Sequence, residues 1–418
     1  MVAGLAHEGL PGMGSEGDSR LYSTFARRGP PDKAGRPPSV PLSLHTSTSP
    51  RDAEDTARPP PATTTCEATM TRLRLRASAV ALVTISACTG QDNTPADTPA
   101  VALLTAGPVS DAGWYAGAYE GLQLIGDSLG FRISHQQTRT PAEFDEAFIS
   151  YADAGYGLIF GHGFEYQDAA SRAGEQYPDV TFVVSSGSRS ADNVIPIIFG
   201  LHEASYLAGM AAGAITQSGI VGMVGGVEIP SAKGTFIAFE AGVRAVRADA
   251  VVLETFIGSW DDVSAAKEAA AAQLRQGADA LIHNVDAATF GFFQAVREAR
   301  AAGGTAWAFG MNRDQNDVAP DVIVGSAVIN IPAIFLQVAL DWSAGALSGP
   351  QFTGLVGNAV DFVPNLAQDG AIPADVLRAI AQAREAIVAG TLEVPSIDFL
   401  EPAAGAEDPG MQGAPLSP

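Results

Sequence analysis

The sequence is poor in cysteine, lysine and charged residues, and each shortage excludes a class of protein. Two cysteines in 418 residues cannot form a disulfide-rich scaffold, and no cluster of Cys and His has the spacing of a zinc site. Acidic residues outnumber basic ones by 46 to 24, which argues against a nucleic-acid binder, because such a protein needs a basic face. No apolar run reaches the roughly 18 residues that a transmembrane helix requires.

Signatures of the common enzyme classes are also missing. The GxSxG, HExxH, P-loop and complete GxGxxG patterns do not occur. Ser264 and Lys267 form an S-x-x-K string within an alanine-rich helical pattern, which we interpret as a chance match. His162 and His283 follow predicted strands and fit a structural role better than a catalytic one. We therefore expect no catalytic residue, no metal site and no cofactor.

What the chain does have is enough apolar material for a sizeable core. Apolar residues make up 46% of the sequence and charged residues only 17%, a balance that favours a folded protein over a disordered one. The length is typical of two or three domains of about 150 residues each.

The first 69 residues do not fit this description. They contain 10 Pro and 7 Gly without apolar periodicity, a composition typical of disorder. We predict that residues 1–69 are a disordered leader or that translation starts at Met70 instead.

A secretory signal is predicted over residues 70–88. An arginine-rich stretch at 70–76 precedes a short apolar region at 77–85, and small residues then lead to Cys88. The ISAC tetrapeptide that ends at Cys88 resembles a bacterial lipobox, which implies cleavage before this residue and lipid attachment to its sulfur. The alternative is a buried cysteine after a short core helix.

The signal implies a lipid-anchored protein at the cell membrane, facing the periplasm or the cell exterior. Residues 89–98 would then be a polar linker to the folded body. Residues 89–418 carry 14 basic and 38 acidic side chains, a formal charge of -24. The tail at 403–418 is predicted to be disordered.

Between these ends, short Val-, Ile- and Leu-rich runs alternate with helical patterns. The predicted strands begin at Val101, Phe131, Gly157, Asp179, Gly219, Val251, Ala278, Thr305 and Asp321. The predicted helices cover 112–129, 142–154, 167–176, 231–246, 261–276 and 289–302. Continuous apolar strands separated by helices predict an α/β protein with parallel sheets covered on both faces. The units are too many for one sheet, so we expect two doubly wound lobes with a ligand cleft at the carboxyl ends of their strands.

Six motifs in the same order resemble the basic membrane protein family, the PnrA-like substrate-binding lipoproteins of ABC transporters. They are GPVSDAGWYAGAYEGL from Gly107, GHGFEYQDA from Gly161, EASYLAGMAAG from Glu203, VGMVGGVEIPSAKGTFIAFEAG from Val221, FIGSWDD from Phe256 and FGMNRDQ from Phe309. The resemblance covers about residues 100–365. It implies the type I periplasmic-binding-protein fold and an ABC permease as partner.

The resemblance also implies the domain boundaries. We expect lobe 1 at 99–199 with about 325–350, lobe 2 at 200–324 with about 351–366, and a C-terminal helix and tail-packing segment at 367–402.

Members of that family bind purine nucleosides between aromatic rings, with carboxylates on the ribose and the base. By resemblance, Trp114 and Phe236 are the expected stacking residues of the two lobes. The other expected ligand-binding residues are Asp111, Tyr115, Phe164, Asp168, Asp286 and Asn312. Several have a structural alternative. Asp111 and Asp168 could be helix caps without any contact to the ligand, and one of the pair Phe236 and Phe239 is expected to belong to the core.

The sequence departs from the family pattern at two positions. Asn312 stands where an aspartate is usual, and Asn330 ends a strand that is usually followed by a lysine. An amide both donates and accepts, so the ligand is expected to be a purine nucleoside, a free base or another flat polar solute. Two other functions stay open: a sensing domain coupled to a membrane receptor, and a nucleoside-processing enzyme. Neighbouring permease and ATPase genes would favour uptake over sensing.

Overall fold

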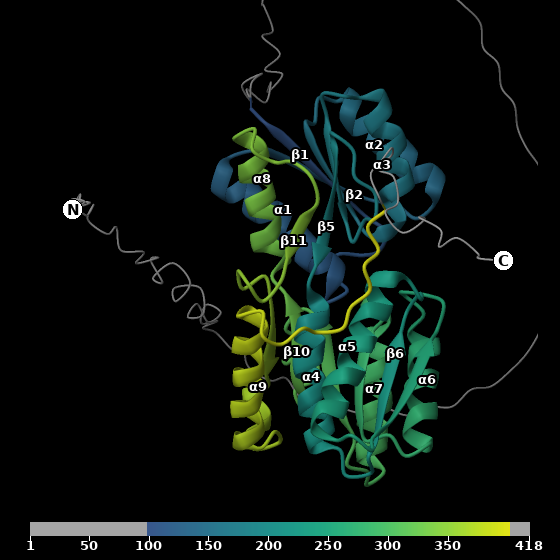
Figure 1. Cartoon of the computed structure of the whole chain (residues 1–418). Coiled ribbons are helices and arrows are strands. Elements are labelled where there is room, and N and C mark those ends of the chain that lie inside the picture. Colours follow the sequence, from purple (N-terminus) through teal and green to yellow (C-terminus); the bar gives the residue numbers. More distant parts are fainter. Residues whose placement is uncertain (1–97, 402–418) are drawn as a thin grey trace, which may run out of the picture. The chain divides into compact units, whose positions relative to one another are not determined.

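A computed structural model gives the structure of the chain and describes residues 98–401 (Figure 1). The predicted leader, signal peptide and tail, the linker up to residue 97, and the lipid-attachment residue Cys88 lie outside the described residues.

Two six-stranded sheets organise the described part of the chain. Sheet A has the strand order β11-β5-β4-β3-β1-β2, and sheet B has the order β12-β10-β9-β8-β6-β7. Every pairing is parallel except that of β12 with β10. The strands of sheet A are β1 (Ala100–Thr105), β2 (Arg132–Gln137), β3 (Leu158–His162), β4 (Thr181–Ser185), β5 (Val194–Phe199) and β11 (Gln351–Thr353). Those of sheet B are β6 (Ile220–Gly225), β7 (Val251–Phe256), β8 (Ala280–Asn284), β9 (Trp307–Asn312), β10 (Ile323–Ile329) and β12 (Val360–Pro364).

Helices cover both faces of each sheet, which confirms the predicted α/β fold class with two doubly wound lobes. Lobe 1, around sheet A, has α1 (Trp114–Leu129), α2 (Pro141–Asp153), α3 (Gln167–Gln176) and α8 (Ile331–Ser343). Lobe 2, around sheet B, has α4 (Leu201–Ile215), α5 (Pro230–Val246), α6 (Val263–Arg275), α7 (Thr289–Ala301) and α9 (Ala374–Val388).

Strand β1 shows how the core is divided. Successive side chains of a strand point to opposite faces. Val101 and Leu103 are buried in the apolar cluster that contains α1 and α8, whereas Ala102 and Leu104 are buried in the cluster that contains α2 and α3. Both faces of the strand are therefore dry, which is why its sequence is apolar throughout.

Helices α4 and α5 approach unusually closely because each has a glycine at the contact. A Cβ on Gly209 would lie 2.1 Å from the carbonyl oxygen of Phe239, and one on Gly242 would lie 2.0 Å from that of Tyr206. No larger residue fits at either position without separating the two helices.

The chain passes between the lobes three times between residues 199 and 360. The crossings are β5 to α4 at Gly200, β10 to α8 at Asn330, and β11 to β12 through residues 354–359. They are joined by backbone hydrogen bonds, from Gly200 N to Thr353 O at 2.5 Å and from Asn330 N to Ala359 O at 2.8 Å. Adjacent crossings of this kind form the axis on which two lobes can close.

The lobe boundaries differ from those expected from the sequence. Strand β10 (Ile323–Ile329) pairs with β9 in sheet B, so residues 325–329 belong to lobe 2 rather than lobe 1. Strand β11 (Gln351–Thr353) pairs with β5 in sheet A, so it belongs to lobe 1 rather than lobe 2. Strand β5 itself was not among the predicted strands. An apolar pattern identifies a strand but not the sheet that the strand joins. Only the hydrogen-bonded neighbours of β10 and β11 show to which lobe each strand belongs.

None of the helices described between residues 98 and 401 combines the length and the apolarity that crossing a lipid bilayer demands.

Candidate functional site

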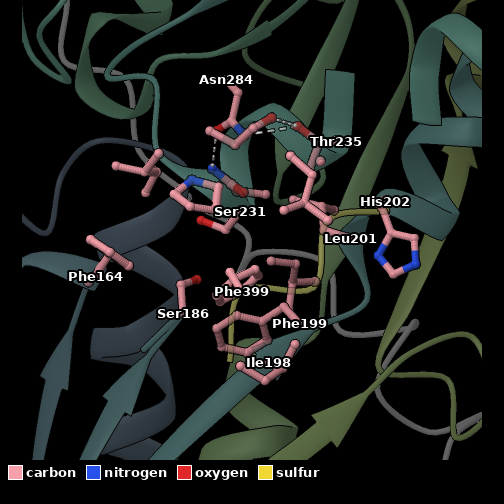
Figure 2. Close-up of a pocket in the computed structure, with 18 of the residues that line it drawn as sticks. Phe164, Ser186, Ile198, Phe199, Leu201, His202, Ser231, Thr235, Asn284 and Phe399 are labelled. Atoms are coloured by element: carbon pink, nitrogen blue, oxygen red, sulfur yellow. Dashed lines mark hydrogen bonds between the residues drawn. The ribbon is translucent and has the colours of Figure 1, made fainter. Parts of the chain in front are cut away.

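A cavity of about 320 Å³ lies between the two lobes, where the carboxyl ends of many of their strands meet. This size is within the range of small-molecule sites. Lobe 1 contributes Trp114, Tyr115, Gly163, Phe164, Glu165, Ser186, Ile198 and Phe199 to its wall. Lobe 2 contributes Leu201, His202, Ser231, Gly234, Thr235, Trp260, Asn284, Asp286, Asn312 and Ile329, among others. Figure 2 shows Ser186, Ile198 and Phe199 facing Ser231, Thr235 and Asn284 across this space.

Trp114, at the start of α1, is an aromatic platform on the lobe 1 side. Its ring stacks on the His162 ring with 3.9 Å between centroids, and Phe199 meets it edge-on at 5.5 Å. His162 is fully buried, and it is held by the Ser185 hydroxyl at 2.8 Å and the Trp114 carbonyl at 3.1 Å. Burial lowers the pKa of His162 to about 3, so the ring is neutral and acts as a fixed support. Trp114 lines the cavity, and its stacking on a solute stays a prediction.

Asp111 fixes the first turn of α1, where Trp114 lies. Its carboxylate accepts hydrogen bonds from the amides of Gly113, Tyr115 and Ala116 at 2.8–3.1 Å, and these are the amides that the first turn of α1 leaves unpaired. Asp111 is 1% exposed and is not among the residues that line the cavity. Of the two roles expected for Asp111, helix capping is the one that the geometry shows.

Lobe 2 supplies a polar floor of amides and carboxylate. The Asn312 amide donates to Asp286 at 3.2 Å and to the Asn284 side-chain oxygen at 3.5 Å. Asn284 in turn donates to the Thr235 hydroxyl at 3.4 Å (Figure 2). Asp286 and Asn312 both lie in the cavity wall, and the amide at position 312 partners the carboxyl group at 286. An aspartate at position 312 would instead face a second carboxyl.

The wall carries acidic groups and neither lysine nor arginine. Glu165, Asp286 and Asp398 are its carboxyl groups. Burial raises the pKa of Glu165 to about 7. Burial, together with the charges of Asp111 and Glu165, raises the pKa of Asp286 well above its usual range. Such a wall offers no positive charge to an anionic group such as a phosphate, and its carboxyl groups, which hold their protons more tightly than usual, can donate as well as accept.

The backbone around the cavity is strained at several strand ends. Ser186, Asp286 and Asn312 have positive φ values of 57°, 43° and 69°, and all three line the cavity. Ala112, two residues before Trp114, has a φ of 59°. Non-glycine residues adopt this conformation at a cost, and such strain concentrates at functional sites.

Three of the predicted site residues lie outside the cavity wall: Asp111, which caps α1, Phe236 and Asp168. Phe236 is fully buried inside lobe 2, where its ring packs on Phe256 at 5.3 Å, so the expectation that it stacks on a ligand is wrong. The face of α5 toward the cavity carries Ser231 and Thr235, and Phe236 follows one residue later, about 100° around the helix.

Asp168 also lies outside the cavity wall, so the expectation that it binds the ligand is wrong. Its side chain is 60% exposed, it pairs with Arg189 on the surface of lobe 1, and it is absent from the cavity wall. It also makes no N-terminal cap of α3. In the same motif Glu165, three residues earlier, is the acidic group that faces the cavity.

Tyr115 and Phe164 also line the cavity. Sequence reasoning missed Glu165, Trp260, Phe199 and Phe399. The first two lie inside motifs that had been recognised, GHGFEYQDA and FIGSWDD, so their residue types were a usable signal. Phe399 lies after α9, in a stretch that carries no motif.

Among residues 98–401, no group of three or more His, Cys, Asp or Glu side chains is arranged to hold a metal ion.

Comparison with known proteins agrees with this arrangement. The family model described as ABC transporter substrate-binding protein PnrA-like matches residues 98–366. The chain belongs to this family. The matched region includes both sheets and the three crossings, and it ends before α9.

Relatives of the PnrA-like chain have different names. The ABC transporter nucleoside-binding protein BmpA of Lactococcus lactis is 26% identical over 72% of this chain and 90% of its own length. A Haloferax volcanii ABC transporter protein named for glucose binding is 27% identical over 62% of this chain and 66% of its own length. A purine-binding protein of Brucella abortus is 28% identical over 54% of this chain and 64% of its own length.

The fold has solved counterparts among solute-binding proteins. One from Aeropyrum pernix K1 superposes with a TM-score of 0.64 at 21% identity, covering 71% of this chain and 92% of the other. This likeness supports the type I periplasmic-binding-protein fold that the motifs imply.

Proposed function

We propose that this chain is the extracytoplasmic receptor of an ABC uptake system, and that it captures a purine nucleoside or a related flat polar solute between its lobes. In this proposal, Cys88 carries the lipid that anchors the protein to the cell membrane, and the loaded protein delivers its solute to a permease. The cavity binds and releases its solute without chemical change.

One observation carries the ligand class: the cavity combines aromatic rings with an amide and carboxyl floor and has no cationic side chain in its wall. Aromatic rings such as Trp114 stack on any flat solute. Asp286 and Glu165, whose pKa values are raised, can donate as well as accept, as can Asn312 and Asn284. A nucleoside offers a flat base and a ribose diol to these groups, whereas a nucleotide adds a charged phosphate for which the wall has no lysine or arginine partner.

The names of two relatives support the same class, since one is called nucleoside-binding and one purine-binding. The relative named for glucose binding makes a sugar the alternative solute to be tested. A sugar has polar edges for the floor but no extended flat face for the rings.

A thermal-shift screen of the full chain tests this proposal. Purine nucleosides, nucleobases, nucleotides and glucose are compared, and a ligand at 100 times its Kd raises the unfolding free energy by about 2.7 kcal/mol. We expect a rise in melting temperature with at least one nucleoside or base and none with the nucleotides. Stabilisation by glucose alone would overturn the ligand class. Chromatography of the bound nucleoside after prolonged incubation should return it intact, because no turnover is expected.

A further inference from the structure

The chain after α9 passes back over the cavity. Figure 1 shows this segment, in yellow, running from α9 along lobe 2 and on to lobe 1 near α3. Residues 394–401, which we call the strap, have neither helical nor strand structure. Five consecutive strap residues, Ser396 to Leu400, line the cavity.

The strap is fixed at both ends, and the two ends are held by different parts of the molecule. Val394 is buried in the main apolar cluster that contains α4, α5 and α9. At the other end, the amide of Glu401 donates to the Ser188 carbonyl at 2.7 Å, and its carboxylate accepts from Arg189 at 2.9 Å. Ser188 and Arg189 follow β4 in lobe 1, so the strap ties lobe 2 to lobe 1 across the mouth of the cavity.

The fastening on lobe 1 is of a kind that can open. The Arg189 and Glu401 side chains are 44% and 50% exposed, and ion pairs so exposed to water contribute little to stability. Arg189 also pairs with Asp168, so it remains in place on lobe 1 when Glu401 leaves. By contrast, Val394 at the other end of the strap is buried, and releasing that end would expose an apolar side chain to water.

Phe399 gives the strap a direct part in the site. It is half-buried and belongs to the cavity wall, and Figure 2 shows it among Ser186 and Phe199 of lobe 1 and Ser231 of lobe 2. The aromatic ring expected from α5 is absent from the wall, because Phe236 is buried. Phe399 supplies an aromatic side chain from outside both sheets.

We propose that residues 394–401 are a releasable lid on the solute cavity, that Phe399 contacts the bound solute, and that the Glu401–Arg189 pair is the latch. Solute enters and leaves when the latch opens and the strap lifts from its lobe 1 end. Ordering of the strap over the solute excludes water and slows escape. The identity of the solute rests on the proposed function, but the lid does not.

Ligand kinetics test the lid on the full chain and its variants. Stopped-flow mixing with adenosine, guanosine and adenine measures association and dissociation rates. A chain that ends at Pro395 lacks the lid, and we expect it to release the probe about tenfold faster than the full chain. We expect the same increase for Phe399→Ala, because this variant loses one stacking contact with the probe. Arg189→Gln weakens the latch by removing the ion pair, while the hydrogen bonds of Glu401 with the Ser188 carbonyl and hydroxyl remain. It should raise both rates by up to about fivefold, with little change in Kd.

Arg172→Gln is the matched control. It removes an equally exposed arginine–carboxylate pair, with Asp145, from the surface of lobe 1 away from the cavity. Its rates should equal those of the full chain. Dissociation unchanged in both Phe399→Ala and Arg189→Gln would overturn the lid, and these substitutions decide the matter even where the shortened chain folds poorly.

A second readout needs no ligand. Trp114 and Trp260 line the same cavity as the strap residues 396–400, so we expect lifting of the strap to expose these rings to solvent. Quenching of tryptophan fluorescence by acrylamide should increase in the shortened chain and in Arg189→Gln, but not in Arg172→Gln. If none of the probes binds but quenching increases as stated, the lid stands and the proposed ligand class fails. Equal quenching in all four proteins would overturn the lid whatever the ligand.

Discussion

Glu165 offers the sharpest test of the electrostatics of the cavity. Its carboxyl group lies in the cavity wall, and burial raises its pKa from 4.5 to about 7. The folded protein therefore holds this proton more tightly than the unfolded chain does. The stability that the group contributes is fully present below pH 4.5 and is lost as the pH rises toward 7.

The size of this effect follows from the two pKa values. A shift of one pKa unit corresponds to about 1.4 kcal/mol, so Glu165 should lower the free energy of unfolding by about 3 kcal/mol between acid and neutral pH. Glu165→Gln removes the titrating group. The free energy of unfolding of the parent, minus that of the variant, should fall by about this amount across the same interval.

Urea unfolding of the full chain at pH values from about 4 to 8 measures the difference. Glu175→Gln is the control, because Glu175 is an exposed glutamate on α3 of the same lobe. The free energy of unfolding of Glu175→Gln should change with pH in the same way as that of the parent. Parallel pH curves for the parent and Glu165→Gln would refute the reasoning, because Glu165 would then have the same proton affinity in both states.

Substitutions at three buried residues test the roles assigned to them, each by urea unfolding together with titration of a bound solute. Phe236→Ala should cost about 3–5 kcal/mol of stability, as for other buried phenylalanines, and leave solute affinity within about twofold; a large loss of affinity in a stable variant would return Phe236 to the site. Asp111→Ala should cost about 1–2 kcal/mol by uncapping α1, and Asp111→Asn should recover part of this loss, a pattern that direct contact with the solute alone would not produce. Gly242→Ala should destabilise the protein by about 1–3 kcal/mol, because its Cβ would lie 2.0 Å from a backbone oxygen of α4. Gly390→Ala is the control: no atom lies near its Cβ position, and its positive φ of 68° should cost only about 1 kcal/mol.

Much of the fold could be predicted because the local signals agree. The helix predicted at 167–176 has the bounds that the structure gives to α3, and Pro141 begins α2 after Thr140 caps it. Buried parallel strands such as β1 are apolar on both faces, so they are visible in the sequence. The partners of β10 and β11 were not predictable, because the sheet that a strand joins is decided by contacts far away in the chain.

The site was predictable only where position along a strand fixes direction. Asn312 ends β9, Asp286 lies two residues after β8, and Trp114 begins α1, the helix that follows β1. Residues near the carboxyl ends of parallel strands meet at the cleft. Phe236 lies within a helix, where one residue turns the side chain by about 100°, and motif resemblance does not resolve that rotation.

Phe399 was beyond prediction for a different reason. The strap has no periodic pattern, and its place over the cavity depends on the pairing of Glu401 with Arg189, 212 residues apart in the chain.

The central claim is that the interlobe cavity captures a flat solute on the Trp114 ring. Titration calorimetry of the full chain, Trp114→Phe and Trp114→Ala with the nucleoside or base that gives the largest thermal shift tests this claim most directly. Because stacking on one aromatic ring is worth about 1–3 kcal/mol, Trp114→Ala should weaken binding by about five- to 150-fold and Trp114→Phe much less, with all three proteins folded. Equal affinity in the three proteins would contradict the account, because the solute would then bind without the ring on which this site is built.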